Sequence, residues 1–138
     1  ELSRTQIREK DFLVTIKGRV GNVAVVEHLP GPININQDVA LLRLKKGYHP
    51  YYIAGFLNSL AGKALIERIS TGQINPFLGL GNLKQIPIPL FDESTMNTIG
   101  EAIQQKVEAA YKARQEAARL LDEAKSRVEA WVRGEATL

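Results

Sequence analysis

The last third of the sequence constrains the fold most strongly, because it reads as a single long helix. From residue 94 to residue 133 the chain contains no proline, and its only glycine is Gly100. A helix of roughly 40 residues spans about 60 Å, which is longer than a domain of this size is wide. Ser94 and Thr95 are the expected N-caps, and Gly134 is expected to end the helix.

Apolar residues recur every seven residues along this segment, which is the pattern of a coiled coil. One row contains Val107, Leu121 and Val128 and is interrupted by Arg114. The other contains Met96, Ile103, Ala110, Ala117, Ala124 and Trp131. The period predicts a left-handed supercoil. Three successive alanines would let a partner helix approach closely, as in an antiparallel pair. The alternative is a helix that lies over its own domain, although so long a stripe exceeds the surface available to cover it.

The charge divides the chain into two parts. Residues 94–138 hold seven Lys/Arg and seven Asp/Glu, whereas residues 1–93 hold eleven and eight, so the net charge of +3 belongs to the first part. We therefore expect a domain over 1–93 and a spacer or dimerisation helix over 94–138. The basic bias is too mild to indicate nucleic-acid binding by itself. Because the chain begins at Glu1 rather than Met, we expect a fragment that lacks the domain's N-terminal portion.

Several classes of function are disfavoured by what the sequence lacks. It has no cysteine, which excludes disulfides and thiol chemistry and is compatible with the cytoplasm. The longest apolar runs are only about six residues, so we expect no membrane segment. His28 and His49 have no companions at metal-ligand spacing, and we interpret both as structural. No nuclease-like acidic pair, glycine-rich cofactor loop or adenine-methyltransferase motif is evident, so we expect no enzyme activity, metal or cofactor in this chain.

The first part reads as an α+β arrangement. Runs rich in β-branched and aromatic residues at 11–16, 23–26 and 39–44 predict three strands. Apolar periodicity predicts two short helices, one after Pro50 to residue 58 and one over 61–69. The glycine-containing loop 17–22 predicts a hairpin between the first two strands. Segment 83–90 alternates apolar residues with prolines, which fits an edge strand or an extended linker.

Polar side chains in the loops are candidates for DNA contact. Alternation across 33–37 would put Asn34 and Asn36 on one face and Gln37 on the other. Asn and Gln amides suit bidentate contact with an adenine edge, but they also commonly satisfy turn backbone. The hairpin cations could equally be solvated. The candidate DNA-binding residues are Lys17, Arg19, Asn34, Asn36, Gln37, Thr71, Gln73, Asn75 and Lys84.

An ordered set of stretches resembles one protein family. They are TIKGRVGNVAVV (15–26), ININQDVALLRL (33–44), PYYIAGFLNSLAGKALIERISTG (50–72) and LKQIPIPL (83–90), followed by the long helix. In this order the chain is similar to the target-recognition domain of the DNA specificity subunit of type I restriction-modification systems. That family usually carries two such domains, each followed by a long helix, and the two helices pack antiparallel.

The resemblance implies a non-catalytic subunit that recognises double-stranded DNA. It would dock methyltransferase subunits, which use S-adenosylmethionine to methylate adenine, and through them the restriction subunits. Because only one domain and one helix are present, the resemblance implies a half-subunit that forms an antiparallel homodimer. Lys17, Arg19 and Lys84 would then contact phosphates. The expected base-reading side chains are Asn34, Asn36, Thr71, Gln73 and Asn75.

The combined expectation is a small β-rich target-recognition domain with two short helices, followed by one long coiled-coil helix. Two other interpretations stay open. The chain could be the C-terminal recognition module of a single-chain methyltransferase-nuclease. It could also be a coiled-coil interaction protein with no role in nucleic-acid binding, whose loops would tolerate substitution.

The alanine row generates a prediction about self-association. We expect Ala117→Glu to block it, because the substitution places a charge in a closely packed seam. Sedimentation measures the outcome, and a variant that still dimerises would show that the seam is wrongly assigned.

Overall fold

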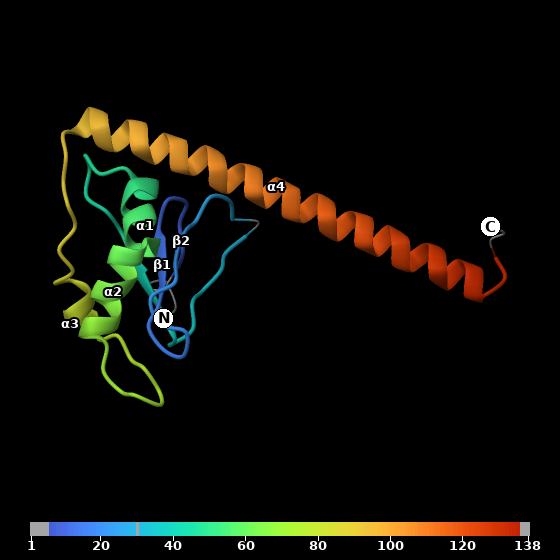
Figure 1. Ribbon diagram of the computed structural model, residues 1–138, viewed down its shortest axis with the longest axis horizontal. Helices are drawn as coiled ribbons and strands as arrows, with labels where there is room; N and C mark the ends of the chain where they lie inside the picture. The colour runs from blue at the N-terminus through green and yellow to red at the C-terminus, as the bar shows by residue number, and fades with distance from the viewer. Residues whose placement is uncertain (1–5, 30, 136–138) are drawn as a thin grey trace. The chain divides into compact units, whose positions relative to one another are not determined.

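The computed structural model describes residues 6–29 and 31–135, and Figure 1 shows their arrangement. The elements in chain order are β1 (Phe12–Thr15), β2 (Val23–Val25), β3 (Val39–Leu42), α1 (Pro50–Asn58), α2 (Leu60–Ile69), α3 (Leu80–Leu83) and α4 (Glu93–Val132). The α+β class, the three strands, the two short helices and the long helix are confirmed. The chain forms two compact units, residues 1–103 and 104–138. We call the described residues of the first unit the head and those of the second unit the distal helix. Residues 1–5 and 136–138, at the ends of the two predicted domains, lie outside the described residues.

The sheet is built around its central strand. The strand order is β2-β1-β3, and β1 pairs antiparallel with both neighbours. Phe12 lies opposite Val25 on one side and Leu42 on the other. Phe12 and Val14 are 1% and 0% exposed, and they point to the same side because strand side chains alternate. The predicted hairpin between the first two strands is therefore confirmed.

The helices α1 and α2 cover the core. Pro50 occupies the first turn of α1, as expected, and Ile53 and Leu57 are buried. The Ser59 side chain accepts a hydrogen bond from the Gly62 amide at 3.2 Å and so caps α2. A Cβ on Gly62 would lie 2.2 Å from the Phe56 carbonyl oxygen, so only glycine fits where the two helices meet.

The short helix α3 was not predicted. It has four residues, of which only Leu83 is buried, so it is too short to produce a periodic signal. The chain from Lys84 to Asp92 forms no strand, which leaves the extended linker as the correct alternative for 83–90. Ile86 and Ile88 pack against the core from this linker. The intervening prolines are exposed.

The two ends of α4 are capped in different ways. Its N-cap is Asp92 rather than Ser94 or Thr95, since the Asp92 carboxylate accepts hydrogen bonds from the Thr95 amide at 2.9 Å and the Thr95 hydroxyl at 2.6 Å. These bonds, the hydroxyl's foremost, lower the pKa of Asp92. At the other end Gly134 has φ of 72°, and the amides of Gly134 and Glu135 bond back into the last turn in a Schellman motif. The predicted stop at Gly134 is confirmed.

The first turns of α4 belong to the head, which corrects the expected pairing row. Met96 is 5% exposed and lies in the hydrophobic core of the head. Ile103 is half-buried, and its side chain lies against Gly55 of α1. A seven-residue repeat cannot distinguish an apolar residue that packs on its own domain from one that meets a partner. The row open to a partner therefore begins at Val107.

Gly100 is required by the close approach of α4 to His49. A Cβ at this position would lie 2.0 Å from His49 Nδ1, an atom that is buried and has no hydrogen-bond partner. Burial lowers the pKa of His49, although the nearby Glu101 carboxylate acts in the opposite direction. The His49 imidazole thus occupies the space in which a side chain at position 100 would lie.

This contact generates a double-mutant prediction. We expect Gly100→Ala to lower the free energy of unfolding by about 2 kcal/mol, because the new methyl group collides with the imidazole. In a His49→Ala background the same change should stabilise by up to about 1 kcal/mol, since alanine is the better helix former. Denaturant unfolding of the four proteins measures the cycle. The same destabilisation in both backgrounds would contradict the contact.

Candidate nucleic-acid interface

The C-terminal end of β1 brings three loops together. The Ile16 amide donates to the Asp38 carbonyl at 2.8 Å, and the Leu78 amide donates to the Ile16 carbonyl at 2.9 Å. Lys17 also forms an isolated β-bridge with Phe77. Loops 17–22, 36–38 and 71–77 therefore meet at the lower end of the head in Figure 1.

Loop 17–22 is held firmly on α2. Gly21 has φ of 83°, and a Cβ there would lie 2.6 Å from Cγ2 of Ile66. The Lys63 ammonium donates to the Gly21 carbonyl at 2.6 Å and to Asn22 Oδ1 at 2.9 Å. The backbone of this loop is thereby fixed, whereas its outer side chains are exposed. Lys63 matches no motif in the sequence, and only the tertiary contact shows its role.

The two predicted phosphate contacts in this loop differ in their surroundings. The Lys17 side chain is 46% exposed, and its ammonium lies 3.9 Å from the Asp38 carboxylate. Arg19 is exposed, and its guanidinium forms no hydrogen bond or ion pair with any other residue that the structure describes. Arg19 is the more available of the two cations for an external phosphate.

Loop 71–77 is a closed turn with an apolar tip. The Thr71 and Phe77 amides donate to each other's carbonyls at 2.9 and 2.8 Å, and the Thr71 hydroxyl also donates to the Phe77 carbonyl. Thr71 thus closes the loop. Gln73 and Asn75 are exposed, and Ile74 between them is 92% exposed. Ile74 was missed by the sequence analysis, because an isolated apolar residue in a loop gives no periodic signal.

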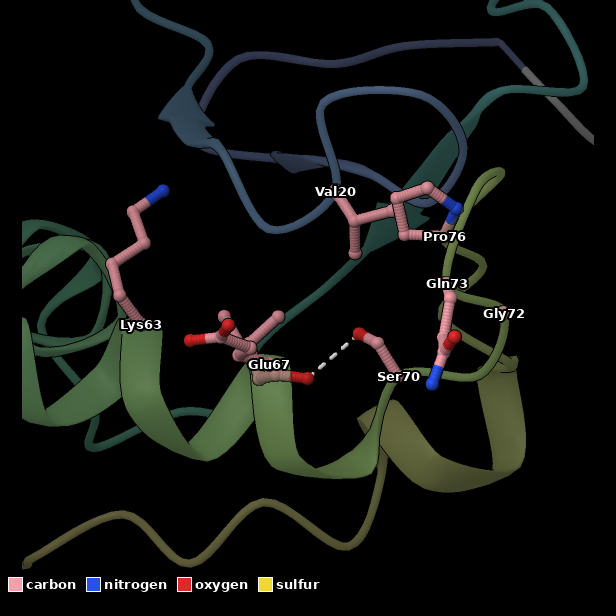
Figure 2. Close-up of a pocket in the computed structure, with 8 residues that line it drawn as sticks. Val20, Lys63, Glu67, Ser70, Gly72, Gln73 and Pro76 are labelled. Carbon is pink, nitrogen blue, oxygen red and sulfur yellow. Dashed lines mark hydrogen bonds between the residues drawn. The ribbon is translucent and has the colours of Figure 1, made fainter.

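An open groove lies between loops 17–22 and 71–77 and helix α2, as Figure 2 shows. Its volume is about 620 Å³. The walls combine apolar with polar side chains, namely Val20, Ile66 and Pro76 with Lys63, Glu67 and Gln73. Such a surface offers both apolar contact and hydrogen bonding to a ligand.

The remaining predicted DNA contacts are dispersed. Asn36 Oδ1 accepts from the Asp38 amide at 3.1 Å, so this side chain satisfies its own turn, the commoner use of an isolated Asn. The expected alternation of two faces over 33–37 is absent. Ile33, expected on the face opposite Asn34 and Asn36, is itself 42% exposed, and Gln37 is exposed at the start of a turn. Asn34 forms a bridge with Gln6, and Lys84 is exposed at the end of α3.

The distal helix presents its apolar stripe to solvent. Val107, Leu121, Val128 and Trp131 are 47%, 62%, 60% and 54% exposed, and Ala110, Ala117 and Ala124 are exposed as well. Tyr111 and Leu120, which flank the two rows, are 62% and 51% exposed and widen the stripe. Neither was assigned to it from the sequence, because they lie outside strict heptad positions.

Some charged side chains of the distal helix pair with one another on its outer face. Arg119 bonds to Glu116 at 2.9 and 2.6 Å and also to Glu123. The hydrogen bonds from Arg119 lower the pKa of Glu116 and, in return, raise the pKa of Arg119. These residues lie opposite the apolar rows in the heptad. The ion pairs therefore leave the stripe uncovered.

The described part of the chain contains neither a cluster of metal ligands nor a membrane-spanning helix. Within 6–29 and 31–135, no cluster of three or more His, Cys, Asp or Glu side chains could hold a metal ion. None of the described helices has the length and apolar character needed to cross a membrane.

No protein-family model matches the chain, and the search of curated proteins found no match. The likeness to a specificity subunit therefore stays a prediction from the sequence.

The contact between Lys63 and loop 17–22 generates a prediction. We expect Lys63→Met, which keeps the aliphatic stem but removes the ammonium, to speed hydrogen exchange at the Gly21 and Asn22 amides several-fold. Arg68→Met on the same helix is the control, because the structure gives its side chain no hydrogen bond to another described residue. Equal exchange in the two variants would contradict the role of Lys63.

Proposed function

We propose that this chain is a DNA-recognition and scaffolding unit of the type found in type I restriction-modification specificity subunits. In this proposal the head contacts duplex DNA through loops 17–22 and 71–77. The long helix pairs with a second helix and sets the distance between two heads. The chain itself performs no chemistry.

The observation that carries the proposal is the joining of the two loops at one end of β1. Their backbones are held by the Lys17–Phe77 bridge and by the Lys63 contacts. Their outer side chains, Arg19, Gln73 and Asn75, are exposed. A cation positions a phosphate, and amides can both donate to and accept from base edges. Rigid loops that display both kinds of group suit the recognition of a nucleic acid.

The exposed stripe of α4 supports the scaffolding part of the proposal. A 40-residue helix is about 60 Å long and carries an uncovered apolar row over its outer part. Two such helices in an antiparallel pair would place two heads at opposite ends of a spacer. A two-fold dimer of this kind would read an inverted repeat with a fixed gap.

The partners and location follow from the same proposal. Methyltransferase subunits would supply S-adenosylmethionine and methylate adenine, and restriction subunits would join through them. This assembly would act on double-stranded DNA in the cytoplasm. If the chain is instead a module of a single-chain methyltransferase-nuclease, the recognition surface stays the same, and only its connection to the catalytic part differs.

The exposed stripe alone would also fit a coiled-coil interaction protein without a role in DNA binding. The two functions differ in what they require of the loops. DNA recognition depends on Arg19, Gln73 and Asn75, whereas a coiled-coil protein would tolerate their substitution.

The loop cations provide the test of the proposed function. We expect Lys17→Ala combined with Arg19→Ala to flatten the salt dependence of binding to a randomised duplex pool, with the slope falling by about 0.9 for each phosphate that is no longer neutralised. The control variant carries Lys112→Ala, on the outer face of α4, and Arg133→Ala, directly after the end of α4. A slope that does not change relative to the control would remove loop 17–22 from the interface.

A further inference from the structure

A group of cationic side chains lies in a part of the head away from loops 17–22 and 71–77. A second pocket of about 300 Å³ lies between the turn 8–11 and the segment 43–50. Five cationic residues line it, namely Arg8, Lys10, Arg43, Lys45 and Lys46, and two acidic residues, Glu9 and Asp11. Five of the eleven Lys/Arg of residues 1–93 are thus gathered in one place. No sequence motif indicates this site, because its two halves are more than 30 residues apart.

A buried carboxylate organises the pocket. Asp11 is 3% exposed and accepts three hydrogen bonds. Two come from the Arg43 guanidinium, at 2.8 and 3.0 Å, and the third comes from the Arg8 amide at 2.8 Å. The Arg43 guanidinium also donates to the Gln6 carbonyl at 3.0 Å. Asp11 therefore ties the turn 8–11 to the end of β3 and holds the planar guanidinium in one orientation.

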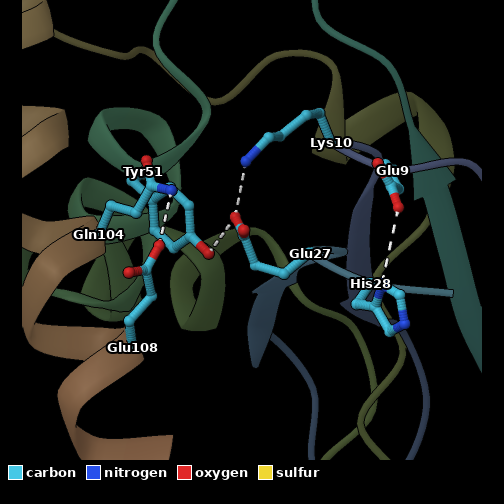
Figure 3. Close-up of polar contacts among 7 residues, drawn as sticks. All are labelled: Glu9, Lys10, Glu27, His28, Tyr51, Gln104 and Glu108. Atoms are coloured by element: carbon cyan, nitrogen blue, oxygen red, sulfur yellow. Dashed lines mark hydrogen bonds and ion pairs between the residues drawn. The ribbon is translucent and has the colours of Figure 1, made fainter.

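Lys10 is held in a similar way. Its ammonium donates to Glu27 at 2.8 Å and lies 5.8 Å from the centre of the Tyr51 ring, and Tyr51 donates to the same carboxylate, as Figure 3 shows. Burial of Glu27 acts to raise its pKa, but the bonds from Lys10 and Tyr51 outweigh it and lower the pKa. The backbone of Lys10 has φ of 67°, a left-handed conformation that is uncommon for a non-glycine residue.

Three cations in the pocket have no ion-pair partner among the residues that the structure describes. Arg43 is neutralised by Asp11, and Lys10 by Glu27. The side chains of Arg8, Lys45 and Lys46 form no ion pair or hydrogen bond with another described residue. The remaining acidic residue of the lining, Glu9, lies 3.9 Å from Nδ1 of His28, as Figure 3 shows. The first turn of α1, which borders the pocket at Pro50, adds a partial positive charge. The pocket is thus a fixed, net-positive concavity.

We propose that this pocket is a phosphate-binding site and that, within the proposed function, it holds a backbone phosphate of the DNA. Arg43 and the turn 8–11 form its rigid floor, and Arg8, Lys45 and Lys46 supply the uncompensated charge. A phosphate offers several acceptor oxygens to such a group of donors. The site carries no base-reading amide among its lining residues, so its contribution is independent of DNA sequence.

The position of the pocket fits a second contact on one duplex. It lies at the Phe12–Leu42 end of the sheet, whereas loop 17–22 leaves the Thr15–Val39 end. About seven residues of extended chain separate Lys10 from Lys17, or roughly 23 Å at about 3.3 Å per residue. This distance corresponds to about seven base pairs at about 3.4 Å each. In this proposal one duplex contacts both ends of the sheet.

The test uses two kinds of substitution, one that removes positive charge from the pocket and one that removes negative charge. We expect Lys45→Ala with Lys46→Ala to lower DNA affinity at about 0.1 M salt by about tenfold or more, equally for all duplexes, and to reduce the salt slope by about 0.9 for each phosphate left without its cation. Glu9→Gln should raise the affinity several-fold, because it removes the opposing charge. The Lys112→Ala, Arg133→Ala variant is again the control. All three positions in the pocket are exposed, so the variants should fold, which circular dichroism checks.

A second measurement separates this inference from the proposed function. Wild-type chain is titrated with inorganic phosphate, and amide shifts are followed by NMR; we expect shifts at residues 8–11 and 43–48 that are absent from the Lys45→Ala, Lys46→Ala variant. Weaker DNA binding by that variant supports the backbone as the ligand. If phosphate shifts these amide signals but the chain binds no DNA, the proposed function is refuted. The pocket would then be a site for phosphate from another source. Unchanged DNA affinity without localised shifts overturns the inference.

Discussion

The central strand β1 is the constraint on which the rest of the head depends. It forms hydrogen bonds on both edges, buries Phe12 and Val14 in the core, and continues past its C-terminal end into pairing with residues 38, 77 and 78. Because a strand that is paired on both sides cannot slip without turning its buried side chains outward, its register is strongly specified. Each loop that leaves or meets this strand inherits a fixed position. The candidate functional surfaces lie at its two ends.

Both surfaces follow one structural plan, in which a few buried groups fix the backbone and leave other side chains exposed. At one end Gly21 and Lys63 seat loop 17–22 on α2. At the other end Asp11 binds the Arg43 guanidinium and the Arg8 amide. Fixing the scaffold before a ligand arrives reduces the conformational entropy lost on binding. Residues such as Asn36 and Thr71, which bond to their own loops, contribute to this scaffold as well.

Helix α4 combines two roles along one continuous backbone. Met96 and Gly100 are buried in the head, and Asp92 caps the start of the helix. Beyond residue 106 the same heptad rows are exposed, and ion pairs such as Arg119 with Glu116 occupy the opposite face. An exposed apolar stripe of this kind is the feature on which the proposed pairing of helices rests.

The sequence by itself determined the α+β class, the positions of the strands and longer helices, and the stop at Gly134, because these depend on local periodicity and on glycine and proline. It also indicated the exposed loop 17–22 and placed the polar residues Thr71, Gln73 and Asn75 in a loop. Only the tertiary structure decided that the Arg19 side chain is free whereas Asn36 bonds within its own turn. It also decided which apolar residues of α4 pack in the core of the head. It alone joined the turn 8–11 to the segment 43–50, since a pocket between segments distant in the chain depends on strand pairing that no local pattern encodes.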